Sequence, residues 1–415
     1  MATRITVNGS RILPGSGAAI KKILVLNHFH TKNPPVTGGE IRYFHIYKEL
    51  SQYFDITLLS QSGGGRTISY SPSYRECRVP MDYRHKQVLG KLMKELSSSR
   101  SGYEINLIKN MVLAKYPTVY KRYFDHLSAS SDIIVHESPY LVEYDQELGT
   151  GSKPRIYNSH NHEFLLAQNT WKNQKAREYL PLLYQLEKKL ATRADLVFAP
   201  SPQDRESFIA LYNLDPGKVK VAPNGVNPRQ WLERRDSSRN GSNGRLKALF
   251  VGANYPPNIE AVDYIVNHLA ARCPKVEFLV AGGCCKPFLR AARPNVKLMG
   301  PVSHREKLHL FAAADLAVNP VLSGGGTNLK TLEFISAGLP LFSTEFGARG
   351  LNLVDKIHYV KAELDNFPTK INALGHCRKM LAEMAERGRQ YVNEHYSWGA
   401  IAKRIKDELD PLLVG

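Results

Sequence analysis

Short apolar runs alternate with helical stretches along most of the chain, and no other feature constrains the fold as strongly. Apolar runs of strand length, each followed by a longer amphipathic segment, are typical of a parallel sheet with helices on both faces. In the first half we expect buried strands at residues 22–27, 55–60, 132–136, 155–160, 195–199 and 219–221. One helix is predicted at residues 39–53, and one long helix at residues 163–193.

The alternation stops at a polar stretch and then begins again. Residues 227–245 are rich in Ser, Asn, Gly and Arg, a composition typical of a linker. Beyond it we expect strands at 247–251, 276–281, 296–299, 316–319 and 339–343, with helices near 257–271, 303–314 and 328–337. Two such units predict an α/β fold with two Rossmann-like, doubly wound domains that face each other across a cleft. Ligands of such sheets bind beyond the carboxyl ends of the strands.

The expected organisation has five parts. Residues 1–20 form a polar tail that lacks a signal-peptide core. The first Rossmann-like domain covers residues 21–227, the linker covers 228–245, and the second Rossmann-like domain covers 246–395. The last stretch, residues 396–415, is expected to form a helix that packs back on the N-terminal domain.

The chain carries a net charge of +18, which predicts an anionic partner. A membrane surface, a phosphorylated or acidic substrate and a nucleic acid all fit that charge. With 415 residues and 43% hydrophobic side chains, the chain can build two or three domains with full cores. No apolar run approaches the roughly 20 residues of a transmembrane helix. The five cysteines have no metal-binding spacing, so we interpret them as reduced thiols of a cytoplasmic protein.

Part of the positive charge is local. Residues 84–122 contain nine Lys or Arg against two acids, and apolar residues recur there at helical spacing. Basic amphipathic helices of this kind can lie on anionic lipid. The alternative is an apolar stripe that faces the protein core beneath a solvated basic face. Both interpretations stay open at the level of the sequence.

The stretch SGGGTNLKTLEFISAGL at residues 323–339 indicates a binding site. Three glycines, a threonine and a lysine stand where a strand should turn into a helix. Glycines let backbone N–H groups approach a phosphate closely, the start of the helix adds its positive end, and Lys330 adds a full charge. Glu333 on the same helix could accept hydrogen bonds from sugar hydroxyls. The stretch therefore predicts a site for a nucleotide diphosphate in the C-terminal half.

Two further turns carry weaker signals. Gly38 and Gly39 follow the first strand and open a helix together with Glu40, so the amides there could hold an anion or a sugar hydroxyl. The alternative is a tight turn in which Glu40 favours the helix dipole. The turn from Gly252 to Asn258 also follows a strand, and it suits either phosphate contacts or a helix that begins at a proline.

Histidines stand at the ends of two expected strands. His136 should point into the cleft, where it could orient a sugar or exchange a proton. His160 and His162 end the next strand, close to Glu163. This is a poor set of tetrahedral metal ligands, so hydrogen bonding to a sugar acceptor is the favoured interpretation. No GxGxxG or Walker lysine motif follows any strand, which argues against a dehydrogenase or a P-loop kinase.

Motifs along the chain resemble, in order, those of the GT-B nucleotide-sugar glycosyltransferases, most closely the family 4-like enzymes of glycosyl transferases group 1. They are the GGE helix start, HESP, NSHNHE, ADLVFAPSPQD, APNGV, FVGANYPPN and GGGTNLKTLEFISAGLPLFST. The resemblance extends from about Lys21 to the end. It implies an enzyme that moves a sugar from a UDP-, GDP- or dTDP-linked donor to a hydroxyl acceptor, without a metal or cofactor and with retention at the anomeric carbon.

The resemblance also implies roles for residues at matching positions. It gives catalytic roles to His136, which would contact the donor sugar, and to Lys330, which would bind phosphate. Together with the turns described above, it implies a donor-binding set of Gly252, Asn254, Asn258, Val302, Gly324, Gly325, Gly326, Thr327, Asn328 and Glu333. The implied acceptor-side set, in the N-terminal domain, is Gly38, Gly39, Glu40, His160 and His162.

The chain departs from the family pattern at two places. The family has a second glutamate eight residues before the one matched by Glu333, and here that position is Gly325. The basic residue usual after the first strand of the second domain is replaced by Asn254 and Tyr255. Lys330 is therefore expected to be the main cationic phosphate ligand.

These observations predict a cytoplasmic glycosyltransferase, peripheral on the inner face of the membrane. Its expected partners are a nucleotide sugar, a hydroxyl acceptor from glycolipid or cell-surface polysaccharide synthesis, and an anionic membrane surface. Three alternatives stay open. The first is a glycosyltransferase that modifies nucleic acid, for which the net charge would serve phosphate contacts. The second is a degenerate subunit that binds nucleotide sugar without turnover, and the third is an epimerase of the same fold.

Overall fold

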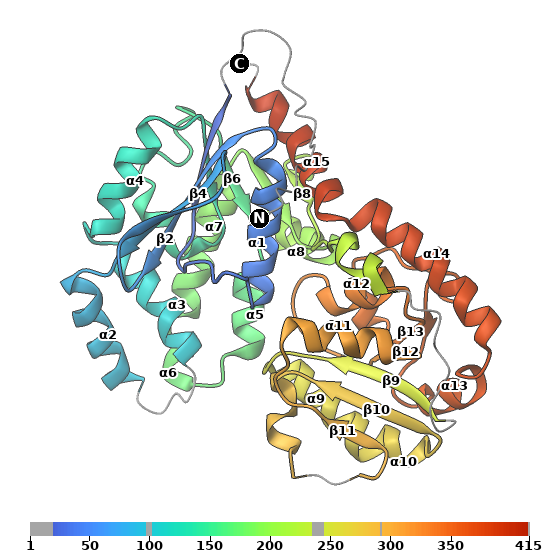
Figure 1. Ribbon diagram of the computed structural model, residues 1–415. Helices are drawn as coiled ribbons and strands as arrows, with labels where there is room; N and C mark the ends of the chain where they lie inside the picture. The colour runs from blue at the N-terminus through green and yellow to red at the C-terminus, as the bar shows by residue number, and fades with distance from the viewer. Residues whose placement is uncertain (1–19, 97–101, 235–244, 291–292, 414–415) are drawn as a thin grey trace, which may run out of the picture.

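The computed structural model describes residues 20–96, 102–234, 245–290 and 293–413. Each half of the chain builds an open α/β unit, and the two units lie side by side as two lobes (Figure 1). We call residues 20–234 the first lobe and residues 245–396 the second lobe. Most of the expected polar tail and of the expected linker falls outside the described residues.

The first lobe contains an eight-stranded sheet in the order β3-β4-β2-β1-β5-β6-β7-β8. Its strands are β1 (Lys22–Leu26), β2 (Asp55–Ser62), β3 (Arg66–Ser71), β4 (Tyr74–Pro80), β5 (Ile133–His136), β6 (Arg155–Asn158), β7 (Leu196–Ala199) and β8 (Val219–Val221). Neighbouring strands are parallel, except that β3 and β4 form an antiparallel pair at the edge. The sequence pattern does not predict this edge pair. No residue of β3 is buried and burial in β4 alternates along much of the strand, so neither strand forms a continuous apolar run.

Helices cover this sheet on both faces (Figure 1). They are α1 (Gly38–Leu50), α2 (Tyr83–Glu95), α3 (Gly102–Leu113), α4 (Val119–Ala129), α5 (Glu163–Thr170), α6 (Gln174–Arg177), α7 (Leu180–Arg193) and α8 (Pro202–Tyr212), with short 3-10 turns at η1 (Pro139–Tyr144) and η2 (Pro228–Arg234). The single long helix expected at residues 163–193 is therefore three helices. Asn173 caps α6 by accepting from the Ala176 amide at 3.1 Å, and a proline occupies the first turn of α7, where its missing N–H costs no helical hydrogen bond.

The second lobe contains a six-stranded, fully parallel sheet in the order β11-β10-β9-β12-β13-β14. Its strands are β9 (Leu246–Val251), β10 (Val276–Ala281), β11 (Val296–Leu298), β12 (Leu316–Asn319), β13 (Leu341–Ser343) and β14 (Val360–Lys361). Its helices are α9 (Pro256–Tyr264), the π-helical η3 (Ile265–Leu269), α10 (Ala270–Arg272), η4 (Gly283–Phe288), α11 (His304–Ala313), α12 (Leu329–Ser336), η5 (Phe346–Ala348), α13 (Phe367–Leu374) and α14 (Arg378–Tyr396). The expected helix at 257–271 is continuous but changes to a π-helical turn in its middle.

The chain returns to the first lobe at its end. After α14, helix α15 (Trp398–Leu409) packs against α1, and the short turn η6 (Asp410–Leu413) follows (Figure 1). Val226 and Ser397 form a parallel bridge where the chain crosses between the lobes for the first and second time. The indole ring of Trp398 stacks on His45 of α1 with the ring centroids 5.4 Å apart. The return of α15 therefore ties the second lobe to the first.

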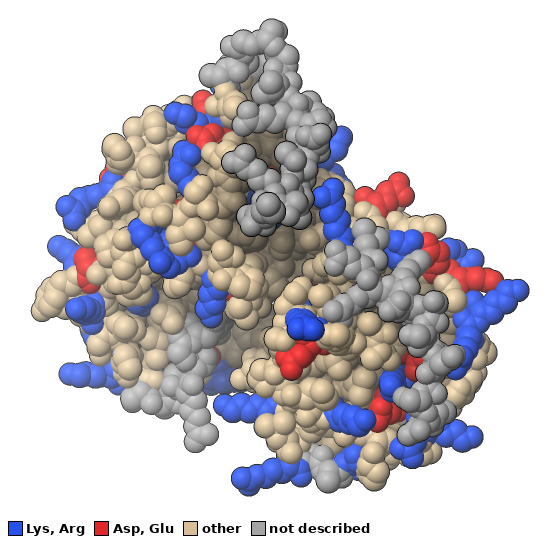
Figure 2. Space-filling model, viewed as in Figure 1, with Lys and Arg blue, Asp and Glu red and all other residues tan. Residues whose placement is uncertain are grey.

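The carboxyl edges of the two sheets face each other. A side-chain Cβ at Gly38, where α1 begins, would lie 3.6 Å from Leu329, where α12 begins. A Cβ at Gly326 would lie 3.4 Å from the backbone oxygen of His160, which follows β6. Figure 2 shows a hollow between the lobes in the same region. The loops that follow the strands of both sheets therefore border one cleft.

The basic helices of the first lobe pack their apolar sides inward. Leu92 of α2 and Leu107, Ile108 and Met111 of α3 belong to one buried cluster. Lys109, which the sequence analysis counted with the basic face, is also buried and donates to Asn106 at 3.3 Å. The apolar stripe of α3 is therefore part of the core. None of the described helices is long and apolar enough to cross a lipid bilayer.

Candidate functional site

A glycine-rich loop joins β12 to α12 at the carboxyl edge of the second sheet. Gly324 and Gly326 have φ of +134° and +58°, a region that residues with a side chain rarely adopt. Arg349 donates its Nε to the Gly326 carbonyl at 3.0 Å and its Nη2 to the Gly324 carbonyl at 3.1 Å. Within the described residues, the amides of 324–328 donate to no acceptor. Amides left free at the start of a helix are suited to bind an anion.

Lys330 lies in the first turn of α12, beside this loop. Its Nζ donates to Asn258 Oδ1 at 2.5 Å and lies 4.3 Å from the centroid of the Phe250 ring. Burial lowers the pKa of Lys330 to about 7, although nearby Cys284 and Glu333 oppose the shift. The amine is therefore poised to gain a full positive charge when an anion binds next to it. The structure thus brings Lys330, predicted to be catalytic, next to Asn258, predicted to bind the donor.

Glu333 lies one turn further along α12. Its Oε1 is 2.6 Å from Nζ of Lys307 on α11, a partner that the sequence analysis did not identify. That lysine in turn lies 5.7 Å from the centroid of the Phe311 ring. The second oxygen of Glu333 accepts no hydrogen bond from the described residues, so it can accept from a ligand hydroxyl while Lys307 holds the carboxylate in place.

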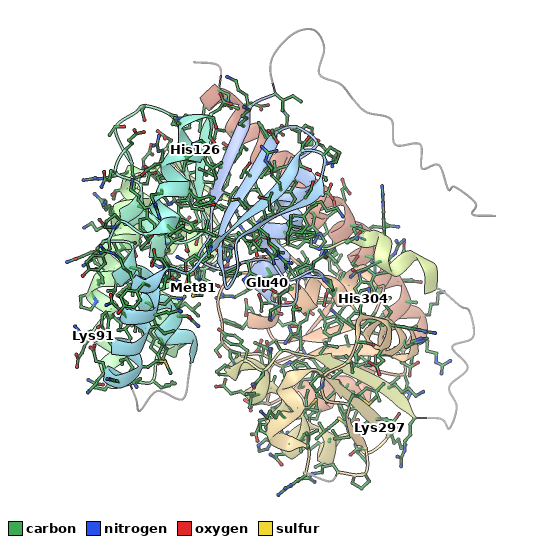
Figure 3. The ribbon with its side chains drawn as sticks, turned by 60° about the vertical axis from the view of Figure 1, so that its left-hand side comes forward. Glu40, Met81, Lys91, His126, Lys297 and His304 are labelled. Atoms are coloured by element: carbon green, nitrogen blue, oxygen red, sulfur yellow. The ribbon has the colours of Figure 1, made fainter. Side chains whose placement is uncertain are left out.

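The start of α1 supplies the facing side of the cleft. Glu40 accepts from the amides of Val36 at 2.8 Å and Thr37 at 3.0 Å, and its own amide donates to the Thr37 hydroxyl. This capping box uses the Glu40 carboxylate to begin the helix. Gly39 leaves room for a neighbour, because a Cβ there would lie 3.0 Å from Nδ1 of His160. Of the predicted GGE motif, the two glycines border the cleft and the glutamate acts as a helix cap. Figure 3 shows Glu40 on the side of the first lobe that faces the second lobe.

A buried carboxylate that the sequence analysis did not assign lies behind His160. Glu137 is fully buried; its Oε1 accepts from Asn158 Nδ2 at 2.8 Å and from the Tyr47 hydroxyl. Its Oε2 lies 2.5 Å from His160 Nε2. The residue follows β5, directly after His136. The alternation of a strand places consecutive side chains on opposite sides, and this was the signal that could have drawn attention to it.

His136 and His162 are not brought to the cleft. The ring of His136 is fully buried and its Nε2 lies 3.0 Å from Asp145 Oδ2. Burial opposes the ionisation of Asp145, yet hydrogen bonds and charge from His136 and Arg155 outweigh it and lower the pKa of Asp145 to about 2. His162 stacks on Phe208 at 4.3 Å and lies against Glu187 within the core. His136 does lie at the carboxyl end of its strand, as predicted, but its side chain does not point into the cleft.

The separation of His160 from His162 bears on metal binding. The former borders the cleft while the latter is enclosed, so the two do not point at a common centre. Among the described residues, no group of three or more His, Cys, Asp or Glu is arranged to hold a metal ion.

Contacts with Asn224 and Asn161 join the glycine-rich loop to the first lobe. The amide of Asn224 donates to Thr327 Oγ1 at 2.9 Å, and its side-chain Nδ2 donates to the Thr327 carbonyl at 2.8 Å. A Cβ at Gly325 would lie only 2.4 Å from Asn161 Oδ1. Residues of both lobes therefore form one site.

The other predicted donor residues make fewer contacts. Gly252 is buried against Asn258, and Asn254 is exposed on the turn that follows β9. Val302 is half-buried on the loop before α11, and Asn328 occupies the position before the first residue of α12 without a side-chain cap. These residues lie on loops that follow strands of the second sheet, and neither Asn254 nor Val302 has a hydrogen-bonded partner among the described side chains.

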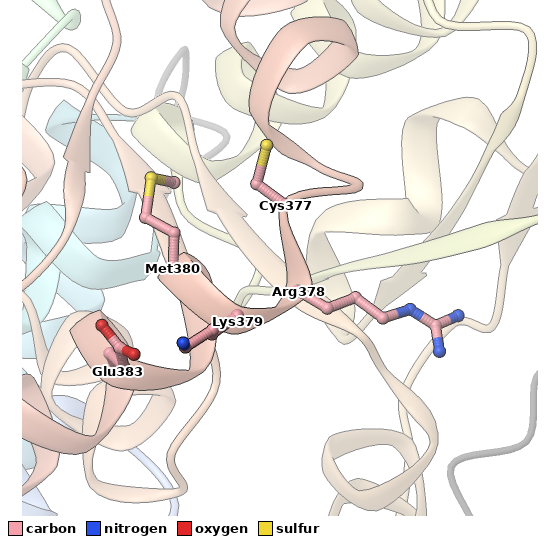
Figure 4. A pocket seen from close by; sticks show the side chains of 5 residues that line it. All are labelled: Cys377, Arg378, Lys379, Met380 and Glu383. Atoms are coloured by element: carbon pink, nitrogen blue, oxygen red, sulfur yellow. The ribbon is translucent and has the colours of Figure 1, made fainter.

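A surface pocket of about 530 Å³ lies elsewhere, at the start of α14. Its lining residues are Cys377, Arg378, Lys379, Met380 and Glu383. Figure 4 shows that the side chain of Arg378 points away from those of Lys379 and Met380. The charged groups of this pocket do not converge on one point. The interlobe cleft is therefore the better candidate for the functional site.

Comparison with known proteins covers both lobes. Residues 245–374 match the model of the family described as Glycosyl transferases group 1, and residues 103–230 match that of Glycosyltransferase Family 4. D-inositol 3-phosphate glycosyltransferase of Mycobacterium sp. (strain JLS) is 24% identical over 177 residues, which are 39% of this chain and 39% of that relative. The chain therefore spans about two fifths of the length of this curated relative.

Solved structures resemble nearly the whole chain. Sucrose-phosphate synthase from Thermosynechococcus elongatus has a TM-score of 0.70 at 15% identity, with 95% of this chain and 99% of that chain covered. Anabaena HepE in complex with UDP has a TM-score of 0.65 at 14% identity, with 94% and 100% covered. A UDP-forming trehalose-phosphate synthase from Burkholderia xenovorans has a TM-score of 0.63 at 14% identity, with 95% and 99% covered. At these identities the likeness shows a shared fold.

Proposed function

Because this chain belongs to the GT-B glycosyltransferases of the group 1, family 4-like type, we propose that it moves a sugar from a nucleotide-diphosphate donor to a hydroxyl acceptor that is a glycolipid or a cell-surface polysaccharide precursor. One observation supports the donor site above all. The amides of residues 324–328 donate to no acceptor among the described residues, and Lys330 follows them in the first turn of α12. An anion of diphosphate size is the chemistry that such a site binds.

The same groups serve the chemical step that we propose. As the bond between the anomeric carbon and the diphosphate breaks, negative charge grows on the departing oxygen. Lys330 and the loop amides stabilise that charge, a task that needs no metal ion or cofactor. The anomeric carbon becomes oxocarbenium-like, and the acceptor oxygen attacks it from the face that the diphosphate leaves. The proton of the acceptor hydroxyl passes to the leaving phosphate oxygen, so the product retains the configuration.

The first lobe would hold the sugar and the acceptor. His160 borders the cleft with its Nε2 bound to buried Glu137, so its ring keeps one orientation. The Nδ1 atom lies on the side of Gly39. We assign to His160, in place of His136, the contact with a hydroxyl of the donor sugar or of the acceptor.

A donor screen tests this function. The purified protein is incubated with UDP-, GDP- and dTDP-linked sugars, and the released nucleoside diphosphate is measured with and without an extract of membrane glycolipids. We expect release from one nucleotide class, stimulation by the extract, and unchanged rates in EDTA. A protein that neither releases nor binds any of these nucleotides would contradict the proposal. A complete loss in EDTA that Mn²⁺ restores would contradict the metal-independent step alone.

The outer surface of α2 supports the part of the proposal that places the acceptor at a membrane. Lys86, Lys91 and Lys94 are exposed there, and so are the large side chains of Tyr83 and Met93. Figure 3 shows Lys91 on the outer edge of the first lobe, away from the second lobe. Lysines interleaved with exposed apolar groups are suited to an anionic lipid surface. We therefore propose peripheral attachment to the membrane through α2, with binding to nucleic acid as the competing outcome.

A further inference from the structure

The glycine-rich loop lacks a side chain at its centre, and a residue of the other lobe occupies the space. A Cβ at Gly325 would lie 2.4 Å from Asn161 Oδ1 and 3.1 Å from Asn161 Cγ. Real Cβ atoms do not approach another atom this closely. The amide group of Asn161 thus stands where a side chain of residue 325 would project.

The Asn161 side chain is held by a short chain of hydrogen bonds. Its Nδ2 donates to Glu163 Oε1 at 3.3 Å, and Glu163 Oε2 accepts from the Tyr140 hydroxyl at 2.6 Å. The backbone oxygen of Asn161 accepts from the Ser159 hydroxyl. Burial raises the pKa of Glu163, and the neighbouring Glu187 adds to the shift while the Tyr140 hydroxyl opposes it. Because Nδ2 is bound to the Glu163 carboxylate, Oδ1 is directed toward the glycine-rich loop.

We propose that Asn161 is a positioning residue for the transferred sugar, delivered by the first lobe into the phosphate-binding loop of the second. Its amide would hydrogen-bond a hydroxyl of the donor sugar, and Glu163 with Tyr140 would keep the amide oriented. The inference rests on the proposed function and names a group that distinguishes a nucleotide sugar from its nucleoside diphosphate. The groups that would bind the diphosphate are Lys330 and the loop amides, and all of them belong to the second lobe. Recognition of the sugar therefore requires the lobes to be together, whereas binding of the diphosphate does not.

Equilibrium binding to matched ligands tests this division. Calorimetry compares UDP with UDP-glucose and GDP with GDP-mannose, for the wild-type protein and for Asn161→Ala. For the pair that binds the wild type, we expect Asn161→Ala to weaken the sugar nucleotide about tenfold and the nucleoside diphosphate less than twofold. Asn169→Ala is the matched control, because Asn169 is exposed on the neighbouring helix α5. Equal weakening of both ligands, or of neither, would overturn the proposal.

Exchanging the side chains of residues 161 and 325 tests whether the amide group itself binds the sugar or only fills the space between the lobes. Gly325→Asn alone should lose affinity for the sugar nucleotide, because two side chains compete for one space. Asn161→Gly combined with Gly325→Asn places one amide in that space from the opposite lobe, and we expect it to bind the sugar nucleotide more tightly than either single variant. A double variant no better than the singles would contradict the role of the amide. These affinities need no turnover, so a wild-type protein that binds a sugar nucleotide without transferring it would overturn the proposed function alone.

Discussion

Glu137 and His160 form a contact of 2.5 Å between a fully buried carboxylate and a histidine that borders the interlobe cleft. The two residues follow adjacent strands, β5 and β6, whose carboxyl ends meet at one edge of the sheet. Asn158 and Tyr47 hold the other oxygen of the carboxylate. The histidine therefore keeps one ring orientation without a ligand, and this supports a role in catalysis for His160.

We expect Glu137→Gln to lower kcat by roughly tenfold to a hundredfold, because a neutral amide holds the His160 ring in its orientation less strongly than the carboxylate does. Affinity for the nucleoside diphosphate should stay the same, since we propose that the other lobe binds that ligand. Steady-state kinetics and calorimetry measure the two effects, and a melting curve confirms that the variant is folded. A variant with unchanged kcat would show that His160 needs no orienting acid.

Lys330→Ala should lower kcat roughly a hundredfold, because it removes about 3 kcal/mol of transition-state stabilisation. The reason is the loss of the cation beside the departing diphosphate. Lys297→Ala is the control: it removes an equal charge from an exposed site of the second lobe, where the lysine pairs with Glu277 at 2.8 Å. Wild-type rates of transfer in Lys330→Ala would show that the loop amides alone stabilise the leaving group.

The lowered pKa of Lys330 predicts that binding depends on pH. Burial brings the pKa of Lys330 to about 7 in the free protein. A bound diphosphate must raise that pKa, because the anion attracts the ammonium form. Above pH 7 the free protein has to take up a proton to bind, so affinity should fall as pH rises, by at most tenfold per pH unit. Below pH 7 the lysine is already charged, and this contribution levels off.

Calorimetry between pH 6 and pH 9, in two buffers with different ionisation enthalpies, counts the protons taken up. Lys330→Arg serves as the control, because a guanidinium stays charged throughout this range and the titration of the nucleotide itself is common to both proteins. The slope above pH 7 should disappear in the arginine variant. An identical slope in both proteins would place the titrating group elsewhere.

Gly225→Ala should destabilise the junction between the lobes. A Cβ at Gly225 would lie 2.6 Å from Cε3 and 2.7 Å from Cδ2 of the Trp398 indole, which is itself wedged against His45 of α1. We expect a loss of roughly 1–3 kcal/mol in the free energy of unfolding, measured by denaturant titration. Gly63→Ala is the control, because a Cβ at Gly63 meets no atom within 4 Å. Equal stability of the two variants would mean that the indole shifts without cost.

Replacing the exposed lysines of α2 should weaken binding to membranes. The triple variant Lys86→Gln, Lys91→Gln and Lys94→Gln is expected to sediment less with anionic liposomes, because each lysine near such a surface contributes about 1 kcal/mol. Lys109 is left unchanged because it is buried. A control with the same change of charge replaces three exposed lysines of the second lobe, Lys275, Lys297 and Lys379.

Transfer to a short soluble acceptor should survive in the α2 variant. If liposome binding stayed constant while salt-sensitive retention on DNA fell, the nucleic-acid alternative would replace the membrane proposal.

The sequence by itself determined the features that depend on local chemistry. Alternating apolar runs and helical stretches established two α/β units, because burial of a parallel strand leaves a continuous apolar run. The glycine-rich turn with Lys330 and Glu333 predicted a donor site, because amides, a helix start and a cation suit a diphosphate wherever they occur together, and this site stays a prediction. The family that the motifs indicated is confirmed by the matches to both lobes.

Tertiary structure alone decided which polar groups reach the cleft. His136 and Glu137 are adjacent in sequence, and the alternation of the strand turns them to opposite sides. Only the packing of other segments encloses the first with Asp145 and pairs the second with His160. Likewise, the absence of a side chain at position 325 is explained only by Asn161 of the other lobe, which occupies the space that a side chain there would need. Contacts between residues so far apart along the chain depend on how complete lobes pack, and no local pattern of residue types encodes them.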